Sequence, residues 1–324
     1  MNTRSLFPVT LPAVLWFCAF ATGAVGAQNA EPMADAKKVQ ADLSSLQRRA
    51  GGGDARAEYL LGRAFMTGTG VSQNYVEAAK YYRQSAAQAL PDAEFALGYL
   101  YEQGKGVTRD YHQAFIYYTA AAEQGHLTAE NNLGSMYENG RGVHRDLGKA
   151  EHWYRIAAEG GDATAQCNLA SLYFRGRGIV RNYSQSAEWF QHAAELGYAP
   201  AQEDLAWMYF TGTGVPLDYS AAAHWVRMAA EKGYARAQLD LGYLYEQGKG
   251  VSLNYVTAYM WYHAAASGGE QRAVDRMKGL SPVMTKEQIS QASVAAERLS
   301  RSMPRVDGAT DRKSIGASFL GTRE

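Results

Sequence analysis

A unit of 36 residues occurs six times in this chain of 324 residues, with no insertion or deletion between copies. A fixed period of roughly 20 to 50 residues is typical of solenoids, in which each unit packs only against its neighbours. The pattern reads A-x-x-x-L-G-x-x-Y-x-x-G-x-G-V-x-x-D/N-Y-x-x-A-x-x-W-Y-x-x-A-A-x-x-G. The copies begin at Ala57, Ala93, Ala129, Ala165, Ala201 and Ala237.

Each copy is expected to form two short antiparallel helices. In the second copy Ala93, Leu97 and Tyr101 fall at i, i+4 and i+8, which is one face of a helix. Gly104 can then adopt the left-handed conformation that ends this helix, and Asp110 can cap the next one. The sequence therefore predicts an all-α fold, a right-handed superhelical α-solenoid with six full two-helix repeats over residues 57–272.

A glycine recurs inside the first helix of four copies, at Gly62, Gly98, Gly134 and Gly242, and the other two copies have alanine there. A mid-helix glycine costs about 1 kcal/mol relative to alanine. The small residue therefore predicts a close contact between helices. The second helix carries an aromatic ladder, at Tyr81, Tyr117, Trp153, Trp189, Trp225 and Trp261.

The segments that flank the repeats predict capping elements. Residues 34–56 match only the second half of a unit, so we expect an N-terminal capping half-repeat there. Residues 273–302 are expected to form C-terminal capping helices, the last of them capped by Thr285 and running from about Lys286 to Arg301. Residues 303–324 mix charge, Gly and Ser without periodicity, which predicts a flexible tail.

Residues 1–27 have the pattern of a signal peptide: Arg4, an apolar stretch over 11–21 and small residues up to Ala27, after which we expect cleavage. Two alternatives stay open. The segment is an uncleaved anchor, or Cys18 is lipidated, although the bulky Phe17 disfavours that processing. Cleavage would leave Cys167 as the one cysteine, with no internal disulfide. No later segment of the sequence is apolar enough to span a membrane.

The repeats resemble the Sel-1-like repeat family, relatives of tetratricopeptide repeats with a longer loop between the helices. The resemblance implies an α-solenoid that acts as an adaptor or assembly scaffold. Exported bacterial members are associated with envelope assembly, host contact and signalling, and a eukaryotic branch with quality control in the endoplasmic reticulum. We therefore expect an exported protein, periplasmic or secreted in a bacterium and in the endoplasmic reticulum lumen in a eukaryote.

The sequence gives little support to an enzyme. It contains no G-x-S-x-G, H-E-x-x-H or phosphate-loop motif and no Cys/His cluster with zinc spacing. It also lacks the cysteines of the family branch to which penicillin binding and β-lactamase activity are attributed. We therefore expect no catalytic residue, cofactor or metal. Lys and Arg total 32, as do Asp and Glu, so no basic field indicates nucleic acid.

Binding is expected in the concave groove that the first helices line. The side chains two, six and nine residues after the alanine that begins each copy (places two, six and nine) differ most between copies. Aromatic residues gather at both ends of the groove, with small polar residues between them. The candidate binding residues are Tyr59, Arg63, Phe95, Tyr99, Asn131, Ser135, Phe174, Trp207, Phe210 and Tyr243.

Trp, Tyr and Arg dominate the energetically important positions of protein interfaces, because they combine large area with a polar group. The leading hypothesis is therefore a non-catalytic scaffold that binds a partner protein or an extended peptide. A module that binds carbohydrate or peptidoglycan is the alternative, since sugars stack on flat rings. A cell-wall hydrolase or β-lactamase-like enzyme is the third and weakest hypothesis.

Overall fold

The computed structural model describes residues 36–176, 179–303 and 319, and these residues form α-helices and one short 3-10 helix, with no strand among them. The signal peptide predicted for residues 1–27 lies outside this part of the chain. The first helices of the six repeats are α2 (Ala55–Thr67), α4 (Pro91–Gln103), α6 (Leu127–Asn139), α8 (Ala163–Arg175), α10 (Ala199–Thr211) and α12 (Ala235–Gln247). The second helices are α3 (Tyr75–Ala86), α5 (Tyr111–Glu123), α7 (Leu147–Glu159), α9 (Tyr183–Glu195), α11 (Tyr219–Glu231) and α13 (Tyr255–Ser267).

The predicted helix boundaries are confirmed. Asp110 precedes α5, and its Oδ1 accepts hydrogen bonds from the backbone amides of His112 and Gln113, at 2.8 and 3.0 Å. Asn or Asp caps the other five second helices in the same way. Gly104 ends α4 with φ +67°, in the left-handed region that a glycine enters without steric cost.

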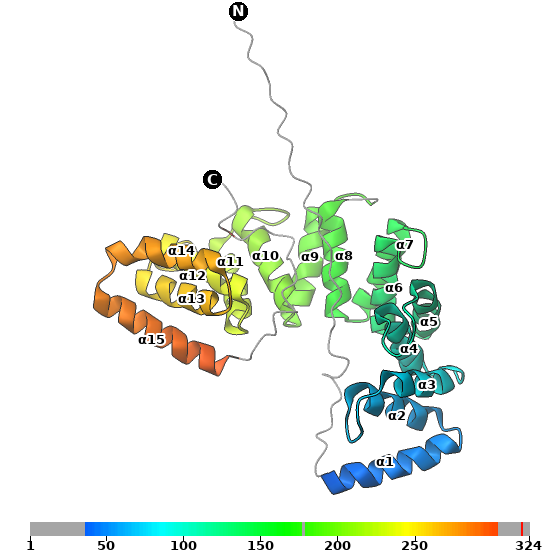
Figure 1. Cartoon of the computed structure of the whole chain (residues 1–324). Coiled ribbons are helices and arrows are strands. Elements are labelled where there is room, and N and C mark those ends of the chain that lie inside the picture. The colour runs from blue at the N-terminus through cyan, green and yellow to red at the C-terminus, as the bar shows by residue number, and fades with distance from the viewer. Residues whose placement is uncertain (1–35, 177–178, 304–318, 320–324) are drawn as a thin grey trace, which may run out of the picture.

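The helix pairs stack into an α-solenoid. Each first helix packs against the second helix of its own repeat, and from α4 onward also against the second helix of the repeat before it. Figure 1 shows the pairs following one another in a curved array from the N-terminal end, in blue, to the C-terminal end, in orange. Each helix therefore buries its apolar face between neighbours, as the unbroken period predicts.

The mid-helix glycines make room for a buried ring. A Cβ atom on Gly134 would lie 2.6 Å from the ring of Tyr154, which is fully buried on α7. Three other repeats place a glycine against a tyrosine in the same way: Gly62 with Tyr82, Gly98 with Tyr118 and Gly242 with Tyr262. In these four repeats the buried ring is thus the residue directly after the member of the aromatic ladder.

A second class of glycine joins one repeat to the next. A Cβ atom on Gly142, in the loop after α6, would lie 2.1 Å from the carbonyl oxygen of Tyr111, at the start of α5 in the preceding repeat. Gly106, Gly214 and Gly250 contact the preceding repeat in the same way. The loops of successive repeats therefore approach so closely that a side chain has no space.

Helices cap both ends of the array. The helix α1 (Ala36–Gly51) packs on α2, and α14 (Gln271–Leu280) packs on α13. After the 3-10 helix η1 (Ser281–Val283), α15 (Lys286–Ser302) also packs on α13 and buries Ala292 and Ala296. Thr285 caps α15 through reciprocal hydrogen bonds with Gln288. Within the described ranges, no helix is both long and apolar enough to cross a bilayer.

Candidate partner-binding groove

Side chains at places six and nine form a strip that passes from one first helix to the next. The ring of Phe174, at place nine on α8, contacts the ring of Trp207, at place six on α10, with centroids 5.7 Å apart. Phe210 on α10 contacts Tyr243 on α12 in the same way, at 6.2 Å. We call this surface the first-helix strip. Its members are Arg63, Met66, Tyr99, Glu102, Ser135, Glu138, Ser171, Phe174, Trp207, Phe210, Tyr243 and Glu246.

The place-two candidates lie inside the array. Tyr59, Phe95 and Asn131 are 9%, 8% and 7% exposed. The ring of Phe95 packs against Tyr118 and stacks on His126, with centroids 5.7 and 4.6 Å away. These side chains are used for packing between helices. Ser135, a place-six candidate, is also buried.

Asn131 accepts a hydrogen bond of 2.8 Å from the Asn168 amide of the next repeat, so the polar middle of the groove is partly an internal contact. Five of the ten candidates keep a partly exposed side chain: Arg63, Tyr99, Phe174, Trp207 and Tyr243. The remaining candidate, Phe210, is 7% exposed, because the ring of Phe319 covers it. Cys167, also at place two, is buried as well.

The residue at place nine depends on the buried residue that it faces on the second helix. Glu102 accepts a hydrogen bond of 2.8 Å from the buried Tyr118 hydroxyl, and Glu138 accepts one of 2.9 Å from Tyr154. Glu246 is likewise bonded to Tyr262. The repeats with Phe174 and Phe210 at place nine have Phe190 and Val226 at the buried position, which carry no hydroxyl. Sequence reasoning missed this pairing, although its signal is a constant spacing of 16 residues.

The place-nine carboxylates are therefore structural. Arg175 pairs with Glu138 at 3.0 Å, and Arg276 pairs with Glu246 at 3.2 Å. Burial raises the pKa of Glu102 to about 7, and the Tyr118 hydrogen bond and the positive charge of Arg141 only partly oppose this effect. Burial also raises the pKa values of Glu58 on α2, Glu94 on α4 and Glu130 on α6.

We expect Glu102→Gln to remove part of the pH dependence of folding. The pKa of Glu102 is about 7 in the folded chain and near 4.5 when exposed, so unfolding releases a proton between these values. The stability that the protonated Glu102 carboxyl provides is present in full below about pH 4.5 and is lost as the pH rises through 7. This loss amounts to about 3 kcal/mol at most. Urea unfolding at pH 5 and pH 8 should show a smaller loss in the variant. Equal losses in the variant and the parent chain would contradict this assignment.

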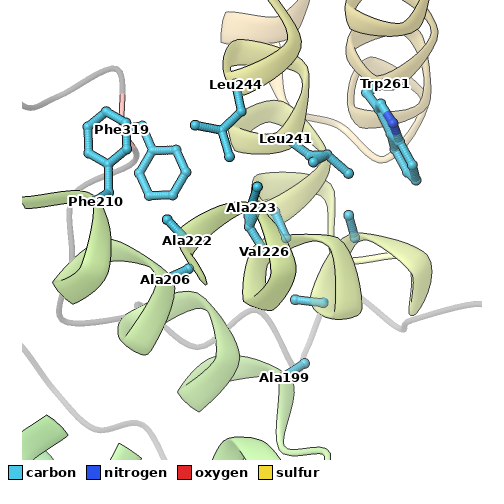
Figure 2. Close-up of a cluster of buried hydrophobic side chains, with 13 residues drawn as sticks. Ala199, Ala206, Phe210, Ala222, Ala223, Val226, Leu241, Leu244, Trp261 and Phe319 are labelled. Atoms are coloured by element: carbon cyan, nitrogen blue, oxygen red, sulfur yellow. The ribbon is translucent and has the colours of Figure 1, made fainter. Parts of the chain in front are cut away.

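One residue of the C-terminal segment lies on the strip. Phe319 is 2% exposed, and its ring stacks on Phe210 with centroids 4.3 Å apart and planes inclined by 10°. Figure 2 shows these two rings together, with Leu244 of α12 nearby. The expectation of a flexible tail over residues 303–324 missed this contact. The signal available was one aromatic residue in a segment otherwise rich in Gly, Ser and charge.

Cations lie beside the rings of the strip. Lys249 lies over the ring of Phe210 with its Nζ atom 5.2 Å from the centroid, and the Arg276 guanidinium lies 5.4 Å from that of Tyr243. Arg276 also lines an open hollow with Glu246, Arg272 and Asp275 at the C-terminal end. The described residues hold no group of three or more His, Cys, Asp or Glu that could bind a metal ion.

Six consecutive matches to the Sel1 repeat cover residues 55–90, 91–126, 127–162, 163–198, 199–234 and 235–270. Each match begins where a first helix begins. The chain belongs to the Sel1 repeat family. The resemblance predicted from the sequence is thus confirmed, together with the solenoid of two-helix repeats that it implied.

Two solved structures of Sel1-type proteins are similar to this chain. A protective antigen present in uropathogenic Escherichia coli strains, displaying an SLR fold, is 32% identical with a TM-score of 0.72, over 82% of this chain and 57% of the antigen. A Sel1 repeat protein from Oxalobacter formigenes is 30% identical with a TM-score of 0.64, over 71% of this chain and 92% of its own. This Sel1 chain therefore spans little more than half of the antigen. Comparison with curated proteins gave no significant match.

Proposed function

We propose that this Sel1 repeat protein is an exported, non-catalytic scaffold that binds a partner protein or an extended peptide along the first-helix strip. One observation carries the proposal: several of the residues that differ between repeats at places six and nine are large and keep partly exposed side chains on the first helices. Tyr99, Trp207 and Tyr243 are such side chains, whereas the repeated alanines and leucines are buried. Side chains of this type provide most of the energy at protein interfaces.

The strip suits a polypeptide better than a sugar. A sugar needs the flat face of an exposed ring, but Phe174 packs against Trp207 with an angle of 73° between the ring planes, so these two rings do not form one flat surface. The chain has no net charge, which gives no electrostatic attraction to nucleic acid. A partner that offers apolar side chains and backbone hydrogen-bonding groups would match the strip.

Export is part of the proposal and rests on the sequence of residues 1–27. In a bacterium the mature chain would lie in the periplasm or outside the cell, and in a eukaryote in the endoplasmic reticulum lumen. The similar Escherichia coli protein is described as a protective antigen, which supports a location outside the cytoplasm. A role in envelope assembly, signalling or contact with a host would suit such a location.

The double variant Tyr99→Ala/Trp207→Ala is expected to reduce partner capture at least tenfold, because each substitution removes a large side chain at a separate end of the strip. Capture is measured by chemical crosslinking in the native compartment and quantitative mass spectrometry of the trapped proteins. The control is Val76→Ala/Tyr255→Ala, which removes exposed side chains of second helices. Circular dichroism should show unchanged helicity in both variants. Undiminished capture by the first double variant would disprove the groove function.

A further inference from the structure

Phe319 is held in its position by two different contacts. Its ring stacks on Phe210, and its backbone amide donates a hydrogen bond of 3.0 Å to Oδ1 of Asp240. Asp240 lies on α12 and is 5% exposed, so this carboxylate is buried where it accepts the Phe319 amide. A hydrogen bond to a carboxylate is stronger than one between neutral groups. Phe210 and Asp240 therefore bind the side chain and the main-chain amide of the same residue, Phe319.

The aromatic residues of α11 and α12 that surround Phe210 in this pocket belong to the repeats themselves. The ring of Phe210 contacts Tyr219 and Tyr243, with centroids 5.2 and 6.2 Å away. Phe174, one repeat earlier, contacts the equivalent residues Tyr183 and Trp207, at 5.1 and 5.7 Å. Phe174 stays partly exposed, whereas Phe210 is 7% exposed and has the additional ring of Phe319 against it. Phe319 thus covers a ring face that the repeat itself leaves open.

The residue types of the pocket occur in two successive repeats. Asp240 follows Phe210 by 30 residues, and Asp204 follows Phe174 by the same interval. Both aspartates occupy the place three residues after the repeat alanine. An extended segment along the groove therefore meets the same pair, a phenylalanine ring and a carboxylate, at two neighbouring repeats.

We propose that Phe210, Asp240 and Tyr243 form a pocket for an aromatic residue of a partner peptide, and that Phe319 is an intramolecular ligand which the partner displaces. This inference rests on the proposed function, since it names the kind of residue that the groove takes near its C-terminal end. A ligand tethered to the same chain acts at a roughly millimolar effective concentration. A partner must therefore compete with the tail, and loss of Phe319 opens the pocket.

The test uses a fluorescein-labelled synthetic peptide of residues 314–324 as the probe, and fluorescence anisotropy with the full chain. Phe319→Ala should bind this peptide at least tenfold more tightly than the parent chain, whose pocket is filled. A peptide that carries Phe319→Ala should not bind. Adding Asp240→Asn to the Phe319→Ala chain should weaken binding about tenfold, because a carboxylate acceptor is replaced. Phe319→Leu, which keeps an apolar side chain, is a second variant should Phe319→Ala lose helicity.

Equal affinity of the peptide for the parent chain and for both variants, or binding that does not need the peptide's ring, would overturn the proposal. A parent chain that sediments as a dimer, and as a monomer after Phe319→Ala, would overturn the intramolecular assignment, because the tail would then fill a neighbour's pocket. The scaffold function and the role of Phe319 as an intramolecular ligand can each be rejected without the other. Peptide binding without any partner capture would reject the scaffold function alone, whereas partner capture without peptide binding would reject the tail ligand alone.

Discussion

Replacing Gly142 by alanine is expected to lower the free energy of unfolding by about 2–5 kcal/mol. The residue has φ +68°, which costs an alanine about 1–2 kcal/mol. The new Cβ would also lie 2.1 Å from the Tyr111 carbonyl oxygen of the preceding repeat. Overpacking typically adds about 1–3 kcal/mol, and main chain yields less readily than a side chain. Urea denaturation followed by circular dichroism measures the change.

Gly161→Ala is the matched control. Gly161 also has a positive φ, of +91°, but a Cβ there would meet nothing within 4 Å. Only the backbone strain of about 1–2 kcal/mol should remain. The difference between the two variants therefore measures how tightly successive repeats are stacked. Equal losses would contradict the close contact between the loop and the preceding repeat.

The second large effect is that Gly134→Ala should destabilise the parent chain but stabilise a chain that lacks the Tyr154 ring. In the parent chain, Gly134→Ala should destabilise by about 1–3 kcal/mol, because the Cβ would lie 2.6 Å from the Tyr154 ring. Tyr154→Ala alone should cost about 3–5 kcal/mol, since a fully buried ring is removed. In the Tyr154→Ala background the clash is absent, so Gly134→Ala should stabilise by about 1 kcal/mol through helix propensity.

This double-mutant cycle should give a coupling energy of about 2–4 kcal/mol between the two positions. Gly148→Ala serves as the control, because Gly148 lies in α7 on an exposed surface and has only the Asp146 side chain near its Cβ direction, at 3.4 Å. It should have the same effect in both backgrounds. Additive effects of Gly134→Ala and Tyr154→Ala would show that the glycine is not there to admit the ring.

The repeat pattern was sufficient to predict the fold, because the residues that define it act locally. Gly104 permits a left-handed helix end and Asp110 caps the next helix through its own backbone neighbours. The need for a small residue at Gly134 was also predictable, since a mid-helix glycine has an energetic cost. These features depend on conformational preferences that a single repeat already contains.

Contacts between repeats were harder to predict. Adjacent aromatic residues such as Trp153 and Tyr154 differ by one helical position, and only the helix packing determines that Tyr154 is the fully buried one. Variation at place nine suggested a binding position, yet Glu102 is fixed by its hydrogen bond to Tyr118. Phe95 at place two was expected in the groove and lies between helices. Phe319 stands out as the one aromatic residue of its segment, but its partner Phe210 could not be predicted, because the two residues are 109 positions apart along the sequence.

The central claim is that partners bind on the first helices and not on the outer surface of the second helices. A photo-crosslinking amino acid introduced at Tyr99 or Tyr243 tests it in the native compartment, with Tyr255 and Ile116 as exposed second-helix controls. The account predicts the same crosslinked partner from positions 99 and 243 and none from positions 255 and 116. Partner adducts from the second-helix positions alone would contradict it.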